Sequence, residues 1–227
     1  MRYRWRENQQ LKCVVAHCGW NRYQLSRFCE CHRERDRKNG HPEAQLVPYA
    51  ARSTAVTEAA AFLHQQLTTG HRQAHKAVEW VRRELCRLPR RSDPRDLRYV
   101  LLIRQAAEGL DPRDLVARFI AGYLLDDRGE DIRPRFKSER NFRVQAGGLL
   151  LLFIAVGSPP WRDRSRSNKR RSTVRAASAA GLKLHAFILF NQALGSFALA
   201  ASDEIKRRRE AALSKERAAR APRPNNS

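Results

Sequence analysis

The stretch that decides the organisation of this chain is CVVAHCGWNRYQLSRFCECHRERDRKNGHP, residues 13–42. It holds four of the five cysteines of the protein. Cys13 and Cys18 form one short pair, and Cys29 and His32 form a second pair after ten intervening residues. Two such pairs joined by a loop can surround one tetrahedral zinc ion. The spacing therefore predicts a structural Zn²⁺ site of Cys13, Cys18, Cys29 and His32, in a basic module over residues 1–43.

Three alternatives stay open for these residues. Cys31 or His41 could replace one of the four ligands, although Cys31 adjoins His32 and two neighbouring side chains reach one ion with difficulty. The cysteines could also lie unliganded in a buried turn, or Cys29 and Cys31 could form a redox pair. A catalytic zinc keeps one coordination position open, whereas four protein ligands saturate the ion. The pattern therefore favours a structural metal.

The same stretch resembles a known kind of small module. The spacing C-x4-C, the sequence F-C-x2-H-x2-R and the exit G-H-P are similar to the Cys3His zinc modules of many phage and mobile-element proteins. The matching residues are Cys13, Cys18, Phe28, Cys29, His32, Arg35, Gly40, His41 and Pro42. The resemblance covers only about the first forty residues. It implies a structural zinc and association with DNA, and it implies nothing about residues 44–227.

Net charge is the strongest global signal. The 227 residues include 45 Lys and Arg against 23 Asp and Glu, which gives a formal net charge of +22. A surplus of this size indicates a polyanionic partner, and nucleic acid is favoured over anionic lipid. DNA is favoured over RNA because of the zinc-module resemblance. The charged start of the chain, MRYRWRENQQLK, lacks the apolar region of a secretory signal, so we expect a cytoplasmic protein.

Two basic segments supply the candidate nucleic-acid contacts. The first is the ligand loop with the helix expected from Cys29 to Asn39, where Trp20 and Tyr23 could also stack on bases. The second is the loop WRDRSRSNKRRSTVR (161–175), with seven basic residues and one acid. The candidate residues are Arg22, Arg27, Arg33, Arg35, Arg37, Lys38, Arg162, Arg164, Arg166, Lys169, Arg170, Arg171 and Arg175. The alternative for the first segment is a solvated face, partly neutralised by its own acids.

The rest of the chain predicts a mainly α protein. Apolar residues recur at helical spacing, and strand-like alternation is almost absent. The sequence DPRDL occurs twice, at 93–97 and 111–115, and each copy offers an Asp N-cap followed by Pro in the first turn. We expect an all-α bundle over 44–160, a basic linker over 161–181, a long helix over 182–219 that packs on the bundle, and a disordered tail over 220–227.

Two apolar runs lie within this helical part. Residues 146–157 are too few to span a bilayer, and residues 182–200 are interrupted by Lys183 and His185. Both segments suit buried core helices, so no membrane contact is expected. They would equally suit the contact surface of a homo-oligomer.

These features predict a zinc-stabilised DNA-binding protein without enzymatic activity, a regulator or accessory factor of a phage or mobile element. One alternative is a metal-dependent nuclease of the His-Asn-His kind, to which Asn39 and His41 would contribute. Another is an RNA-binding or helical scaffold protein. His71 and His75 have a metal-compatible spacing, but the sequence offers them no third ligand.

Overall fold

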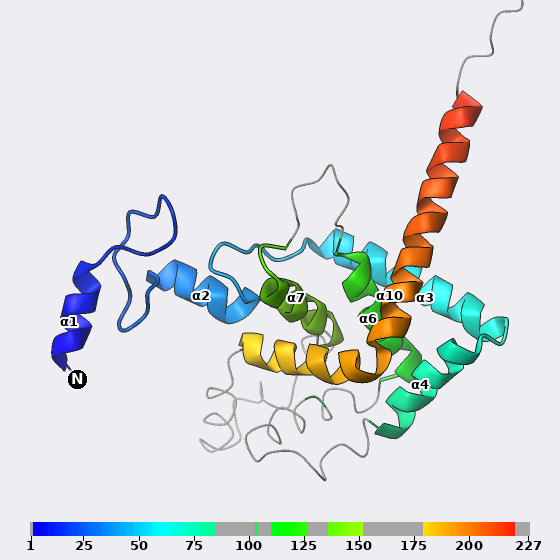
Figure 1. Cartoon of the computed structure of the whole chain (residues 1–227), viewed down its shortest axis with the longest axis horizontal. Helices are drawn as coiled ribbons and strands as arrows, with labels where there is room; N and C mark the ends of the chain where they lie inside the picture. The colour runs from blue at the N-terminus through cyan, green and yellow to red at the C-terminus, as the bar shows by residue number, and fades with distance from the viewer. Residues whose placement is uncertain (1, 85–102, 104–109, 127–135, 152–178, 221–227) are drawn as a thin grey trace, which may run out of the picture.

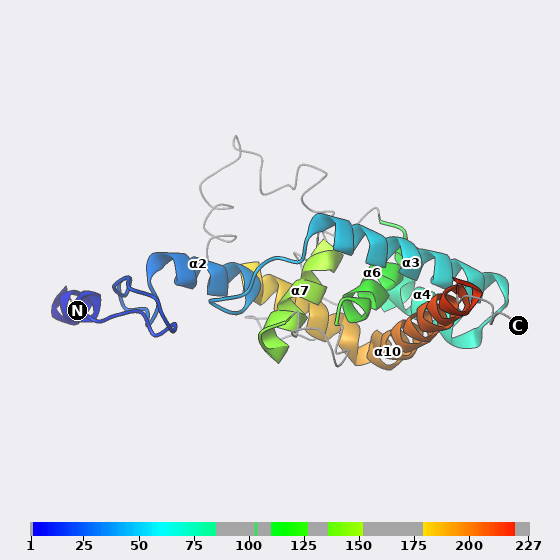
Figure 2. The ribbon, with the colours of Figure 1, turned by 90° about the horizontal axis from the view of Figure 1, so that it is seen from above.

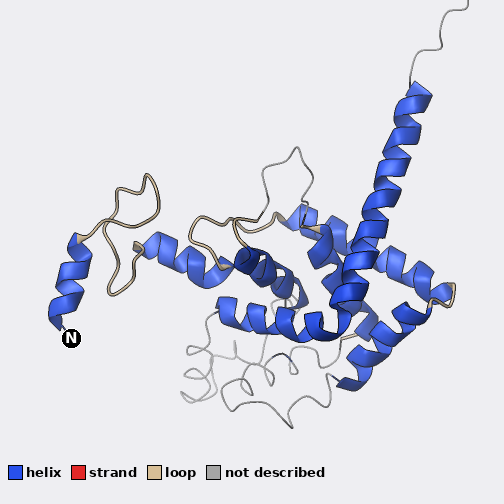
Figure 3. Cartoon of the chain, viewed as in Figure 1, coloured by secondary structure: helices blue, strands red, loops and turns tan. Residues whose placement is uncertain are grey.

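The computed structural model describes residues 2–84, 103, 110–126, 136–151 and 179–220. Within these ranges the chain forms seven helices and no strand, which confirms the predicted mainly α fold (Figures 1 and 3). The helices are α1 (Arg2–Gln10), α2 (Glu30–Asn39), α3 (Tyr49–Thr68), α4 (Arg72–Glu84), α6 (Pro112–Leu124), α7 (Glu139–Leu151) and α10 (Ala179–Arg220).

The helices are arranged as an arm and a body. α1 and α2, with the cysteine-bearing loop between them, extend to one side, and α3, α4, α6, α7 and α10 pack together (Figures 1 and 2). The arm holds the predicted zinc module, and we refer to residues 2–39 as the arm from here on. The remaining five helices form the body.

The predicted helix signals are confirmed where the structure describes them. Asp111 is the N-cap of α6, and its Oδ1 accepts a hydrogen bond of 2.8 Å from the backbone N–H of Arg113. Pro112 and Asp114 lie in the first turn, as the DPRDL pattern predicts. α3 ends at Thr68, just before Gly70, whose φ of +74° is a conformation that favours glycine. The first DPRDL copy and the lone Cys86 lie outside the described residues.

The core of the body is centred on α6. Phe119 and Ile120 are fully buried, and Phe119 contacts Phe187 and Phe190 of α10 with ring centroids 5.7 and 5.8 Å apart. α7 closes the layer with Leu149, which is 1% exposed. The described parts of both apolar runs, 146–151 and 182–200, therefore contribute side chains to the core.

α7 and α10 approach each other closely because α7 carries glycine at the crossing. A Cβ built on Gly147 would overlap the backbone carbonyl oxygen of Lys183. A Cβ on the neighbouring Gly148 would meet only the side chain of Lys183, at 3.4 Å. The close approach of the two helices therefore requires glycine at position 147 but not at position 148.

α10 is longer than predicted at its start. The helix begins at Ala179, so the last residues of the predicted linker 161–181 are helical. It bends between its yellow and orange parts in Figure 1, and residues 210–220 are exposed where its end stands clear of the body. Of the described helices, α10 alone is long and apolar enough to span a membrane by length and composition, a test that core helices also pass, and 39% of its most apolar window is buried inside the protein.

The arm is fixed to the body at the end of α2. The Nδ2 of Asn141 donates to the backbone oxygen of Asn39 at 2.6 Å, and the Nε2 of Gln145 donates to that of Gln45 at 2.9 Å. Gly40 caps α2 with a φ of +78°. The first bond satisfies a buried carbonyl at the end of α2, and the second holds the loop between α2 and α3 against α7.

Candidate metal centre

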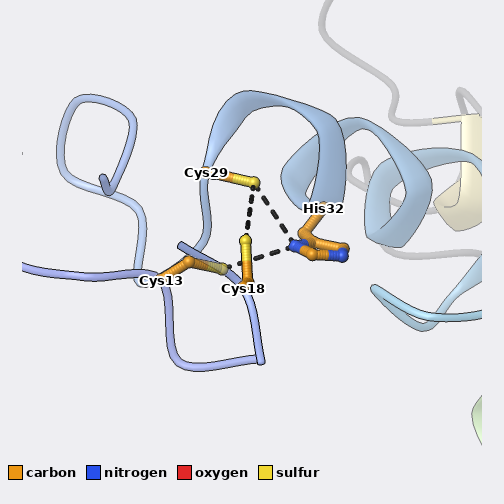
Figure 4. A group of neighbouring side chains, drawn as sticks. All are labelled: Cys13, Cys18, Cys29 and His32. Carbon is orange, nitrogen blue, oxygen red and sulfur yellow. Dashed lines mark hydrogen bonds between the residues drawn. The ribbon is translucent and has the colours of Figure 1, made fainter. Parts of the chain in front are cut away.

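The four predicted ligands lie together at the base of α2 (Figure 4). Their ligand atoms are all within 4.8 Å of one another, so the group can hold a metal ion. The Nδ1 of His32 is 3.4 Å from the Sγ of Cys13 and 3.3 Å from the Sγ of Cys29, and the Sγ atoms of Cys18 and Cys29 are 3.9 Å apart. Tetrahedral bonds of ~2.3 Å to sulfur and ~2.0 Å to nitrogen give edges of about 3.5 to 3.8 Å. The donor spacing fits that geometry.

Two local structures bring the ligands together. Cys29 is the N-cap of α2 and His32 lies in its first turn, so the i, i+3 spacing places both on one side of the helix. Cys13 and Cys18 lie on a turn in which the N–H of Cys18 bonds the carbonyl oxygen of Val15 at 3.1 Å. His17 has a φ of +61° within that turn. The prediction of a helix that starts at the second ligand pair is confirmed.

Burial divides the ligands into two kinds. Cys13 and Cys29 are buried beside Phe28, whereas Cys18 and His32 are partly exposed. Cys13, Phe28 and Cys29 form a small hydrophobic cluster of their own, separate from the core of the body. A core of this size is insufficient to order the arm, so an ion that links the four side chains would supply most of the cohesion.

Hydrogen bonding prepares one thiol for ionisation. Burial tends to raise the pKa of Cys13, but backbone hydrogen bonds from Val15 and Cys29 and contacts with His32 and Cys18 together lower it from 9.0 to about 7. The pKa of Cys18 is raised: a backbone hydrogen bond from Trp20 lowers it, but burial and the neighbouring thiols outweigh that bond. A cation at the centre would favour the thiolate form of both cysteines, because metal-bound thiols ionise.

The residues considered as substitute ligands lie elsewhere. Cys31 is exposed and is not part of the cluster. The Nδ1 of His41 accepts a hydrogen bond of 3.2 Å from the N–H of Glu43 in the turn after α2. The Nε2 of His75 is 3.2 Å from the carbonyl oxygen of Leu67, at the end of α3. Within the described ranges, no second group of three or more such side chains is close enough for a metal.

The predicted cations of the arm fall into distinct environments. Arg37 and Lys38 both bond Glu34, at 2.7 and 3.1 Å, and these bonds lower the pKa of Glu34 to about 2. The guanidiniums of Arg27 and Arg33 lie over aromatic rings, each 4.9 Å from the centroid. Residues 162–175, which hold the other predicted contacts, lie outside the described residues.

Arg22 and Arg35 differ in how freely they present their charge. The Nε of Arg22 donates to the backbone oxygen of Lys12 at 3.0 Å, so this guanidinium helps to hold the ligand loop. Arg35 is exposed on α2. Neither Arg33 nor Arg35 has an acidic partner in the part of the chain that the structure describes.

One contact that holds the ligand loop in place, between the loop and α1, was not predicted. The sequence of α1 has no apolar periodicity, so no helix was predicted over these residues. The Nδ2 of Asn8 donates to the backbone oxygens of Ser26 and Gln24, the first at 2.8 Å, and joins α1 to the ligand loop. A single Asn in a polar segment carries no sequence signal for such a role.

Comparisons with known proteins add no relative. No protein-family model matches the chain, and neither a curated protein nor a solved structure matches it. The resemblance of residues 13–42 to phage and mobile-element zinc modules therefore stays a prediction. A function must be argued from the geometry and charge of the chain itself.

Proposed function

We propose that this protein is a zinc-stabilised nucleic-acid-binding protein that prefers DNA to RNA and serves as a regulator or accessory factor of a phage or mobile element. The observation that carries the proposal is the position of the Cys3His cluster at the first turn of a basic helix. Zinc suits this donor set because it is borderline-soft and takes thiolate and imidazole ligands together. The ion would fix α2 and the ligand loop as one rigid unit.

The distribution of acids on α2 supports a polyanionic partner. Glu34 is engaged with Arg37 and Lys38, and Asp36 pairs with Arg140 of the body at 2.9 Å. Among the described residues, Arg33 and Arg35 form no ion pair with the acids of α2, which also include Glu30 in the turn held by the cluster. A guanidinium on a rigid base can contact a phosphate with little loss of side-chain freedom.

Folding and binding are coupled in this proposal. A structural zinc supplies roughly 10 kcal/mol or more of apparent binding free energy, which here would order the arm. Loss of the ion would release α2 and with it the arrangement of its arginines. Nucleic-acid affinity is therefore expected to depend on zinc even though no base or phosphate contacts the ion.

The nuclease alternative gains no support from its two required residues. Asn39 is buried, and its Nδ2 donates to the backbone oxygen of Ala44 at 3.1 Å. His41 accepts a backbone hydrogen bond in the following turn. Both side chains thus help to fix the path of the chain between α2 and α3.

A salt-titrated binding assay tests the proposal. Fluorescence anisotropy with labelled duplex DNA and duplex RNA of one sequence, repeated with unlabelled heparin as competitor, measures the preference among polyanions. We expect tighter binding to DNA, and a loss of about one unit of the slope of log affinity against log salt for Arg35→Gln. Arg113→Gln, an exposed change on α6, is the control and should leave the slope unchanged.

Two results would overturn the proposal. One is an affinity that does not change when a chelator removes the metal. The other is equal competition by heparin and DNA, which would favour the scaffold alternative.

A further inference from the structure

Trp20 is the most unusual side chain of the ligand loop, because it is 77% exposed on a fixed backbone. Its carbonyl oxygen accepts a hydrogen bond of 2.9 Å from the N–H of Cys13, and its N–H bonds the thiol of Cys18. Two metal-ligand residues thus hold Trp20 in place while its indole lies in water. Tryptophan is among the residue types that most often carry the binding energy of an interface.

A hollow of about 470 Å³ lies beside this indole. Its lining includes Lys12, Trp20, Arg22, Tyr23, Glu30 and Cys31. The hollow is formed where the chain segments around Lys12 and Asn21 pair in an antiparallel bridge. Its volume is in the range of small-ligand sites, and it combines aromatic walls with charged groups.

Both cations of the hollow donate to backbone oxygens, and in the described part of the chain neither forms an ion pair with an acid. The Nζ of Lys12 donates to the carbonyl oxygen of Gly19 at 2.9 Å, and the Nε of Arg22 donates to that of Lys12 at 3.0 Å. Carbonyl oxygens fix the position of these groups without cancelling their charge. Glu30 is the one acid of the lining.

We infer that this hollow receives one unpaired nucleobase, stacked on Trp20, with the adjoining phosphate on Lys12 and Arg22. The inference rests on the proposed function and adds the form of nucleic acid that is bound. Stacking on an aromatic side chain needs an exposed base face, which a duplex does not offer, whereas a phosphate is available in both forms. Glu30 can accept a hydrogen bond from an N–H on the exposed edge of such a base, which an unpaired thymine offers at N3. The arm therefore prefers single-stranded or unpaired nucleic acid.

The charge around the hollow favours a nucleotide over an apolar ligand. Leu25 of the same loop is 69% exposed, so an apolar partner surface or a lipid would also find contacts on the arm. Leu25 does not line the hollow. The cations beside Trp20 and the net charge of +22 match a nucleotide, which carries a planar apolar face and an anion together.

The test compares Trp20→Ala, Trp20→Phe and Leu25→Ala in the full chain loaded with zinc. Anisotropy is measured with three labelled probes of equal length: oligo(dT), the same strand in abasic form, and a duplex. Trp20→Ala should weaken oligo(dT) binding about 5- to 100-fold and change duplex and abasic binding less than twofold. Trp20→Phe should restore most of the loss, and Leu25→Ala should have no effect. Zinc content shows that the loop is intact.

The outcomes distinguish this inference from the proposed function. Wild-type binding of oligo(dT) no tighter than binding of the abasic strand would overturn the inference and leave the function standing. Wild-type protein that binds none of the probes would overturn both. A Trp20→Ala protein that loses binding to anionic lipid vesicles but keeps oligo(dT) affinity would assign the hollow to a membrane and refute the inference.

Discussion

Asp36 and Arg140 form an ion pair of 2.9 Å across the junction of α2 and α7, although they are 104 residues apart. The same Arg140 Nη1 donates to the carbonyl oxygen of Gly40 at 3.3 Å. The pair fixes the end of the arm to the body, and it engages an acid that would otherwise oppose binding of a polyanion to α2. This ion pair thus holds α2 against the body and also neutralises one acid of the basic helix.

Removal of Arg140 should show these two effects at once. Because both side chains are partly exposed, Arg140→Ala should lower the free energy of unfolding by only about 1 kcal/mol or less. It should also weaken nucleic-acid binding, since Asp36 is left unpaired. Arg143→Ala is the matched control, because its partner Glu139 lies on the same helix at 2.9 Å. Equal effects of both variants on nucleic-acid binding would contradict the role given to Asp36.

Substitution of a ligand should remove the metal, and substitution of its exposed neighbour should not. Cys29→Ser is expected to abolish stoichiometric zinc binding and the helical signal of the arm, because the other donors cannot hold the ion in tetrahedral geometry. Cys31→Ser should keep one zinc per chain, since Cys31 is exposed outside the cluster. Elemental analysis and circular dichroism measure both. Retention of a full zinc equivalent by Cys29→Ser would assign the site to other residues.

Zinc affinity should fall on acidification. The pKa of Cys13 is lowered to about 7 in the structure, so its contribution to stability is present above its ordinary value of 9.0 and is lost as the pH falls through 7. Metal binding needs the thiolate, so the apparent Kd should rise at least about tenfold per pH unit below 7. Competition with a chromophoric chelator at pH 8, 7 and 6 provides the measurement. A Kd independent of pH would exclude thiolate ligation.

Two substitutions at the crossing of α7 and α10 test how closely these helices pack in the body. Gly147→Ala places a Cβ against the backbone of Lys183 and should cost about 2 kcal/mol or more, because neither backbone can move without disturbing the core. Gly148→Ala meets only a flexible side chain at 3.4 Å and should be neutral or stabilising by up to ~1 kcal/mol. Thermal unfolding followed by circular dichroism compares the two. Equal Tm values would contradict the close approach.

Local signals made much of this structure predictable. The Asp111 cap and the ligand pairs at Cys13 and Cys29 are each encoded within a few neighbouring residues. A capping side chain or a pair of metal ligands must lie at a fixed spacing in the sequence, so the pattern is visible without a structure.

The contacts between distant segments were not predictable. Asn141 and Gln145 satisfy backbone groups about 100 residues away, and nothing near either residue in the sequence indicates the partner. α1 was missed because its face has no apolar period and its tie to the loop is a single Asn side chain. The exposure of Trp20 likewise follows from the hydrogen bonds of the ligand turn and not from its sequence neighbours.

Gly40 brings the end of the arm into close contact with the body. Its φ is +78°, and a Cβ there would meet the Cγ2 of Val144 at 2.9 Å, so α2 turns directly against α7. Two binding surfaces on a flexible tether accept partners over a range of separations. A direct contact of this kind instead keeps the basic helix of the arm at one separation from the body. A nucleic acid that touches both arm and body would thus be selected by its shape, before any base is read.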